Sequence, residues 1–115
     1  MNAILKFMIT DYTINQYISQ LKKADPELIV IFGSAAADPS RANDLDFFVV
    51  KKTKKNRIDR CLDIKFRWLE NISPSLSVPT DLIVYTPEEF IRAKKEKRML
   101  LEEILTKGKI VYEKN

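Results

Sequence analysis

Two aspartates separated by one residue stand at the start of an apolar segment, Asp44-Leu45-Asp46-Phe47. In an extended strand the side chains of residues i and i+2 project from the same face, so Asp44 and Asp46 are held side by side. Two such carboxylates repel each other, and the pKa of one is expected to rise unless a cation lies between them. Oxygen-rich sites of this kind suit Mg²⁺ or Mn²⁺. The pair therefore predicts a divalent-metal site.

A third carboxylate and a glycine turn are expected beside this pair. Asp81 opens a later apolar strand, and a helical crossover would make that strand parallel to the strand of Asp44, so that both begin at the same sheet edge. Gly33-Ser34 ends an earlier strand, and a short turn back would bring it beside Asp44. Glycine permits close backbone approach, and amides at a helix start bind phosphate. This combination predicts phosphoryl or nucleotidyl transfer with two metal ions.

The composition excludes several other chemistries. The chain has 115 residues, no His and a single cysteine, Cys61. An internal disulfide and a zinc site built from Cys and His are therefore excluded, as are Ser-His-Asp and Cys-His catalysis. Acid–base and metal chemistry must use carboxylates, lysines or tyrosines. Cys61 lies near the apolar side of its helix and is expected to be a small core residue.

Alternating helices and strands are expected to position these residues. Hydrophobic periodicity predicts helices over 11–24, 56–71 and 86–106 and strands over 28–32, 44–50, 81–85 and 109–112. The last helix begins at Thr86-Pro87-Glu88-Glu89, which combines an N-cap, a proline at the first position and the glutamate of a capping box. The expected fold class is α/β (α+β), with a small mixed sheet flanked by helices in a single domain over 1–115.

The motif Phe32-Gly33-Ser34, nine residues and then Asp44-Leu45-Asp46-Phe47 resembles that of the polymerase-β-like nucleotidyltransferase superfamily. Asp81 fits the third carboxylate of that pattern, and nearly the whole chain is similar to the minimal nucleotidyltransferases. The resemblance implies that AMP is transferred from ATP to a hydroxyl, with Mg²⁺ or Mn²⁺ as cofactor and release of pyrophosphate. It further implies that Asp44 and Asp46 coordinate both metal ions and that Asp81 holds the catalytic one and orients or deprotonates the acceptor. Gly33 and Ser34 would cradle the β/γ-phosphates.

The chain departs from this family pattern at three positions. Family members commonly carry Arg and Gly shortly after Gly-Ser and Ser before the first Asp, where this chain has Ala37, Asp38 and Asn43. A triphosphate contact is thereby lost, and Arg41 is the candidate that would replace it from a neighbouring turn.

The resemblance also implies a partner protein. Minimal members are often paired with a small helical protein of the HEPN class, and some act as antitoxins by adenylylating it. A homodimer is a further expectation. The alternative function is a binding module that keeps the fold but silences its partner by contact alone. Phe66 and Trp68 belong either to the core or to a partner-facing surface.

The basic residues give a third and weaker hypothesis. A net charge of +4 suits an anionic ligand. The clusters Lys51–Lys55 and Lys94–Arg98 are expected to be solvated faces, because aromatic residues do not alternate with them as in RNA-binding surfaces. Nucleic-acid binding is therefore ranked below the other two functions. Since no segment is long and apolar enough to span a bilayer and no signal peptide is evident, we expect a cytoplasmic protein without a membrane partner.

Overall fold

The computed structural model describes residues 9–115, so residues 1–8 of the expected domain lie outside the described part. One four-stranded mixed sheet organises the fold. Its strands, in hydrogen-bonded order, are β3 (Thr80–Tyr85), β2 (Leu45–Val50), β1 (Leu28–Phe32) and β4 (Lys109–Glu113). β1 pairs antiparallel with β2 and β4, whereas β2 and β3 are parallel. The mixed sheet and flanking helices confirm the expected fold class.

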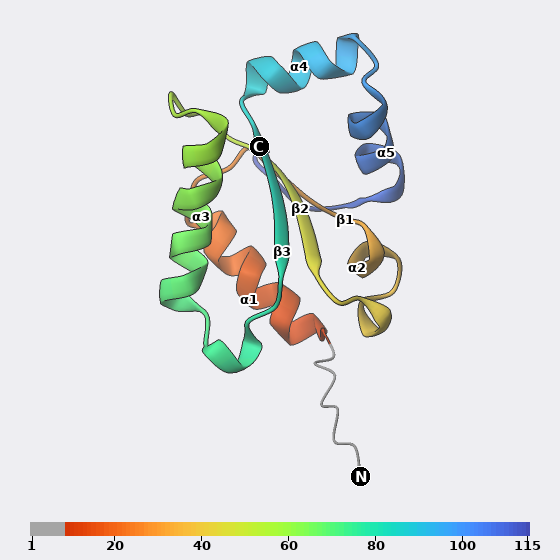
Figure 1. Cartoon of the computed structure of the whole chain (residues 1–115). Coiled ribbons are helices and arrows are strands. Elements are labelled where there is room, and N and C mark those ends of the chain that lie inside the picture. The colour runs from red at the N-terminus through yellow and green to blue at the C-terminus, as the bar shows by residue number, and fades with distance from the viewer. Residues whose placement is uncertain (1–8) are drawn as a thin grey trace.

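Helices cover both faces of this sheet, as Figure 1 shows. α1 (Asp11–Lys22) and α3 (Arg57–Asn71) pack on one face, where Ile29 and Ile31 of β1 meet Leu21 and Trp68. α4 (Pro87–Lys95) and α5 (Met99–Lys107) cover the other, which carries the alternate strand residues. Since successive strand side chains point to opposite faces, both covered faces require apolar residues. This explains why β1 and the interior of β2 are apolar without a polar alternation.

The helix ends follow the expected capping chemistry. Thr10 caps α1 and Asn56 caps α3, each accepting a hydrogen bond from the amide three residues later. Thr86 and Glu89 form the capping box of α4. α1 ends at Lys22, two residues before the expected boundary, and Asp25 adopts φ 56° in the turn before Pro26.

The expected single helix over 86–106 is wrong, because the chain forms two helices there. α4 ends at Lys95 and α5 begins at Met99, while Lys97, within the range of the expected helix, lies in the connecting turn with φ 53°. A continuous helix of this length would extend about 30 Å and run off the small sheet. The turn instead brings Leu101 and Ile104 back onto the face that holds Val30 and Phe48. Tertiary packing therefore overrides helix propensity at this position.

Trp68 belongs to the core, whereas Phe66 lies on the surface. Trp68 is 4% exposed, and its Nε1 donates to the Tyr17 backbone oxygen at 3.1 Å. Phe66, two residues earlier, is 56% exposed. Cys61 is half-buried against the core on the same face as Trp68, and its thiol donates to the Leu82 backbone oxygen. In the described part of the chain, no helix has the length and apolar character needed to cross a membrane.

Candidate functional site

Three aspartates meet where β2 and β3 begin. In the parallel pairing of these strands Asp46 lies directly opposite Asp81, and Asp44 immediately precedes β2. One carboxylate oxygen from each residue can be chosen so that all three lie within 4.8 Å of one another. Asp44 and Asp46 are half-buried, whereas Asp81 is exposed on an edge strand. The helical crossover through α3 thus produces the juxtaposition that the sequence predicts, while the chemical roles of these residues stay predictions.

Gly33 closes one side of this cluster. It follows β1, whose last residue Phe32 is paired with Asp46, and it adopts φ 72°. A Cβ atom at this position would collide with the carboxylate of Asp46. Glycine is therefore required here both by the backbone conformation and by the approach of the carboxylate. The next residue, Ser34, begins the short helix α2 (Ser34–Ala37) and is exposed at the edge of the cluster.

The electrostatics of the cluster favour a bound cation. Burial, together with repulsion by Asp44 and Asp81, raises the pKa of Asp46 to about 6. In the described chain, neither lysine nor arginine approaches any of the three carboxylates within 4.0 Å. Oxygen donors without a protein counter-charge are the set that Mg²⁺ or Mn²⁺ prefers. The residues present therefore fit a divalent metal.

A groove of about 450 Å³ continues from Gly33 between α2 and α5. Its apolar walls include Phe32, Leu100 and Ile104, and Ser34 and Ala37 line the α2 side. Lys107 is the cationic residue of this lining, and its Nζ lies 3.1 Å from Oε1 of Glu103, which also lines the groove. The groove can therefore present one lysine to an anionic ligand beside the three carboxylates.

Lys107 was missed by sequence reasoning. It stands in the last turn of α5, and only the break at Lys97 directs that turn back towards the end of β1. A glycine directly after the helix, Gly108, is a weak sequence signal for this placement. In the structure, a Cβ atom there would collide with Val30 and the backbone of Ile31. Such a glycine indicates that the helix end lies against a strand.

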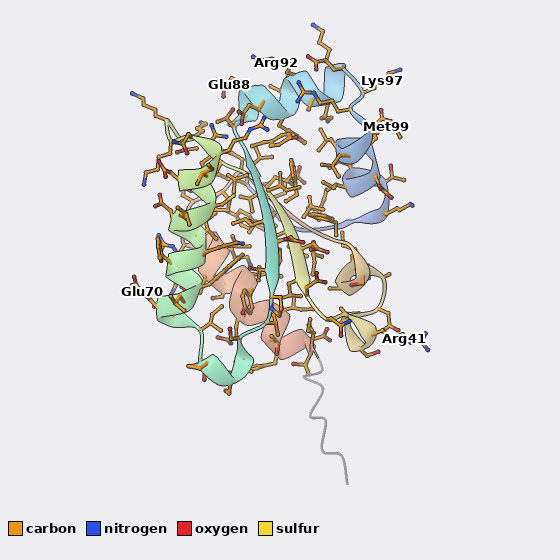
Figure 2. All side chains as sticks on the ribbon, in the orientation of Figure 1. Arg41, Glu70, Glu88, Arg92, Lys97 and Met99 are labelled. Atoms are coloured by element: carbon orange, nitrogen blue, oxygen red, sulfur yellow. The ribbon has the colours of Figure 1, made fainter. Side chains whose placement is uncertain are left out.

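Arg41, the expected nucleotide contact, lies elsewhere. It ends the 3-10 helix η1 (Pro39–Arg41), and its side chain is 87% exposed and points away from the molecule in Figure 2. Its Nε lies 3.5 Å from Oδ2 of Asp38, and it is not part of the groove lining. Asp38 also accepts hydrogen bonds from the amide and hydroxyl of Ser40, so it stabilises its own turn.

Comparisons with known proteins agree with this fold. A family model described as "Polymerase beta, Nucleotidyltransferase" matches residues 13–115. The chain is similar to a chain in a crystal structure of a mutant toxin-antitoxin MntA-HpeT, with TM-score 0.59 and 21% identity over 89% of this chain and 73% of that one. It is also similar to a chain in the structure of a tri-AMPylated Shewanella oneidensis HEPN toxin in complex with MNT antitoxin. There the TM-score is 0.52 and the identity 18%, over 90% of this chain and 71% of that one. No curated protein matches the chain.

Proposed function

Because the chain belongs to the polymerase-β nucleotidyltransferase family, we propose that it transfers AMP from ATP to a hydroxyl group of a partner protein. The observation that carries this proposal is the cluster of Asp44, Asp46 and Asp81 against the glycine turn at Gly33. Such a cluster can hold divalent metal ions at the point where a nucleotide's phosphates enter.

The three aspartates have two kinds of role in this proposal. Asp44 and Asp46 would hold both metal ions and Asp81 the catalytic one, and Mg²⁺ bound there would supply charge neutralisation at the phosphates and polarisation of the α-phosphate. Asp81 is the exposed member, so it is the one that an acceptor hydroxyl can reach from solvent. The acceptor oxygen forms a bond to the α-phosphorus, the bond from that phosphorus to the β-phosphate oxygen breaks, and pyrophosphate leaves. Asp81 orients the hydroxyl and accepts its proton.

In this proposal the triphosphate lies in the groove between α2 and α5. Gly33 leaves room for phosphate oxygens beside Asp46, and the exposed Ser34 hydroxyl is available to donate to them. Lys107 replaces Arg41 as the cation that we assign to the phosphates, because it lines the groove that Ser34 lines. The proposed nucleotide site thus uses one residue that the sequence motif does not contain.

For the partner we propose a helical protein of the HEPN class, with this chain as its antitoxin. The similar structures support this, since their descriptions name a toxin-antitoxin pair and an AMPylated HEPN toxin bound to MNT antitoxin. The protein also carries an apolar surface suited to a protein contact. We call it the α3 stripe, and its exposed residues lie at helical spacing: Ile58, Leu62, Phe66 and Leu69.

The test is transfer of label from ATP carrying ³²P at the α-phosphate to a HEPN-class partner in the presence of Mg²⁺. Label should appear on the partner with the wild-type protein and disappear with Asp44→Ala or Asp46→Ala. Ser34→Ala should weaken the reaction less, because backbone amides share its task. Glu102→Ala, an exposed carboxylate on α5 outside the groove lining, is the matched control and should leave labelling intact. Labelling that persists in Asp44→Ala would refute the assigned site.

The second candidate function is a binding module that neutralises the partner by contact. Ala37 in the groove favours it, since that position offers no charge to a triphosphate. The exposed α3 stripe is compatible with both candidates, so the two must be separated by experiment.

A further inference from the structure

A second hollow of about 420 Å³ lies at the other end of β2 from the three aspartates. The segment that follows β2, the end of α1 and the inner face of α3 form it, on the side of Figure 1 where β2 leads into α3. Six cationic side chains line it: Lys23, Lys51, Lys52, Lys55, Arg60 and Arg67. They outnumber the two lining carboxylates by four, which equals the formal net charge of the whole chain, +4. We call this feature the basic hollow.

Four of these cations already have partners within the described chain. Lys51 donates to the backbone oxygen of Ala24, and Lys55 pairs with Asp63. Lys52 lies 3.8 Å from Glu27, and Arg60 lies 2.7 Å from Glu89. The hollow is therefore a defined feature of the fold, because Lys51 contacts the turn after α1 and the largely buried Arg60 joins α3 to Glu89 of α4.

Lys23 and Arg67 differ from the other four. Among residues 9–115, neither has a carboxylate oxygen within 4.0 Å, although Arg67 is half-buried. Asp25, at the rim, pairs instead with Lys114 at 2.8 Å, and that contact lowers the pKa of Asp25. The hollow thus offers one lysine and one arginine without an acidic partner, next to four cations that have partners.

We propose that the basic hollow binds the phosphate groups of a nucleic-acid backbone, with Lys23 and Arg67 as its main contacts. The planar guanidinium of Arg67 matches the geometry of phosphate oxygens, and neighbouring lysines add point charges. Since no aromatic residue of the described chain lines the hollow, bases have nothing on which to stack. The contact should therefore be sequence-independent and strongly salt-dependent.

This site is independent of the proposed AMP transfer. It lies about 20 Å from the aspartates, the length of the six-residue strand β2, and has the opposite charge. Binding can therefore be measured in EDTA, where the carboxylate cluster holds no metal. A free nucleotide carries the same phosphate chemistry, so ATP and inorganic tripolyphosphate are included as separate ligands.

The experiment is fluorescence anisotropy of a labelled single-stranded RNA of mixed sequence at several salt concentrations. The test variant is Lys23→Glu/Arg67→Glu. The control is Arg92→Glu/Lys95→Glu, which reverses the same number of charges at exposed positions of α4 outside the hollow. The test variant should bind at least about tenfold more weakly than the control. The slope of log K against log salt should fall by roughly 1.4, because each lost phosphate contact contributes about 0.7 for a single strand.

Two further variants separate folding from binding. Lys23→Arg/Arg67→Lys keeps both charges and should retain binding, while Lys23→Gln/Arg67→Gln serves if the charge reversal unfolds the protein. If ATP or tripolyphosphate binds while RNA does not, and the test variant loses this binding, then the hollow binds a free nucleotide or polyphosphate instead of nucleic acid. Equal losses in test and control variants would overturn the proposal. So would failure of all three ligands to bind the wild type, or binding of poly-glutamate as tight as that of RNA.

Discussion

At the scale of single residues, the protonation of Asp46 links the candidate site to stability. Its pKa in the folded protein is raised to about 6 from an ordinary 3.8, chiefly by burial and then by its acidic neighbours. The folded state therefore holds this proton more strongly than the unfolded state does. Without metal, the contribution of Asp46 to the free energy of unfolding is therefore greatest below about pH 4 and decreases as pH rises through 6.

We predict that Asp46→Asn melts at or above the wild-type temperature in chelator at pH 7. The substitution removes a carboxylate that is repelled by Asp44 and Asp81, and it should abolish the loss of stability between pH 4 and 6. Thermal unfolding across this pH range, with EDTA and with Mg²⁺, is the measurement. Mg²⁺ should stabilise the wild type but not the variant. A much lower melting temperature of the variant in chelator would instead identify Asp46 as a structural hydrogen-bond acceptor.

Lys107 is predicted to contact the triphosphate of a bound nucleotide. Its exposed pair with Glu103 contributes little to stability, so a triphosphate can displace the carboxylate at small cost. Lys107→Ala should therefore weaken the binding of a nonhydrolysable ATP analogue with Mg²⁺, and Glu103→Gln should strengthen it. Isothermal titration calorimetry measures both, with Lys95→Ala on α4 as the control. Equal affinities of Lys107→Ala and Lys95→Ala would exclude Lys107 from the site, and an unchanged affinity in Asp44→Asn/Asp46→Asn would exclude the metal site.

At the scale of elements, the short strands and their register could be predicted, whereas the path of the C-terminal helices could not. The aspartate spacing and the crossover through α3 place Asp46 opposite Asp81, because a two-residue period and parallel pairing leave few alternatives. The break between α4 and α5 has no glycine or proline to mark it. It arises from packing against Val30 and Phe48, which sequence periodicity does not report.

The residues of the site that depend on tertiary packing could likewise not be predicted from the sequence. Gly33 and the three aspartates could be predicted because the local chain positions them. Lys107 could not, since its approach to the groove depends on the turn at Lys97. The basic hollow could not be predicted either, because Lys23 after α1 and Arg67 in α3 lie on opposite sides of the Lys51–Lys55 cluster in the sequence.

The turn at Lys97 between α4 and α5 can be tested by glycine substitution. Lys97 has φ 53°, a conformation that costs most residues about 1 kcal/mol but that glycine adopts readily. Lys97→Gly should therefore leave the free energy of unfolding unchanged or raise it slightly. Arg92→Gly, at an exposed position inside α4, should lower it by about 0.5–1 kcal/mol. Denaturant unfolding measures both, and equal destabilisation would indicate one continuous helix.

At the scale of the whole molecule, its surfaces are divided by chemistry. The acidic cluster and the groove lie at one end of β2, and the basic hollow lies at the other. The α3 stripe lies on the outside of the helix that connects these two ends. A partner docked on α3 would therefore be close to both ends of the strand. This arrangement suits a small domain that holds its target with one surface and modifies it with another.

Docking on the partner and AMP transfer to it use different residues, so variants can separate the enzymatic function from silencing by contact alone. Phe66→Ser/Leu69→Ser should weaken the complex with a HEPN-class partner by at least about tenfold, because it removes two exposed apolar side chains of the α3 stripe. Ile91→Ser/Met99→Ser removes two exposed apolar side chains outside the α3 stripe and should leave the complex intact. Asp44→Asn/Asp46→Asn should bind the partner normally but fail to silence it, since docking without AMP transfer leaves the partner active. Complex formation is measured by calorimetry and silencing by the partner's activity in the presence of ATP and Mg²⁺. If the double-aspartate variant silences the partner as well as the wild type does, then contact alone is sufficient and the binding-module function replaces the enzymatic one.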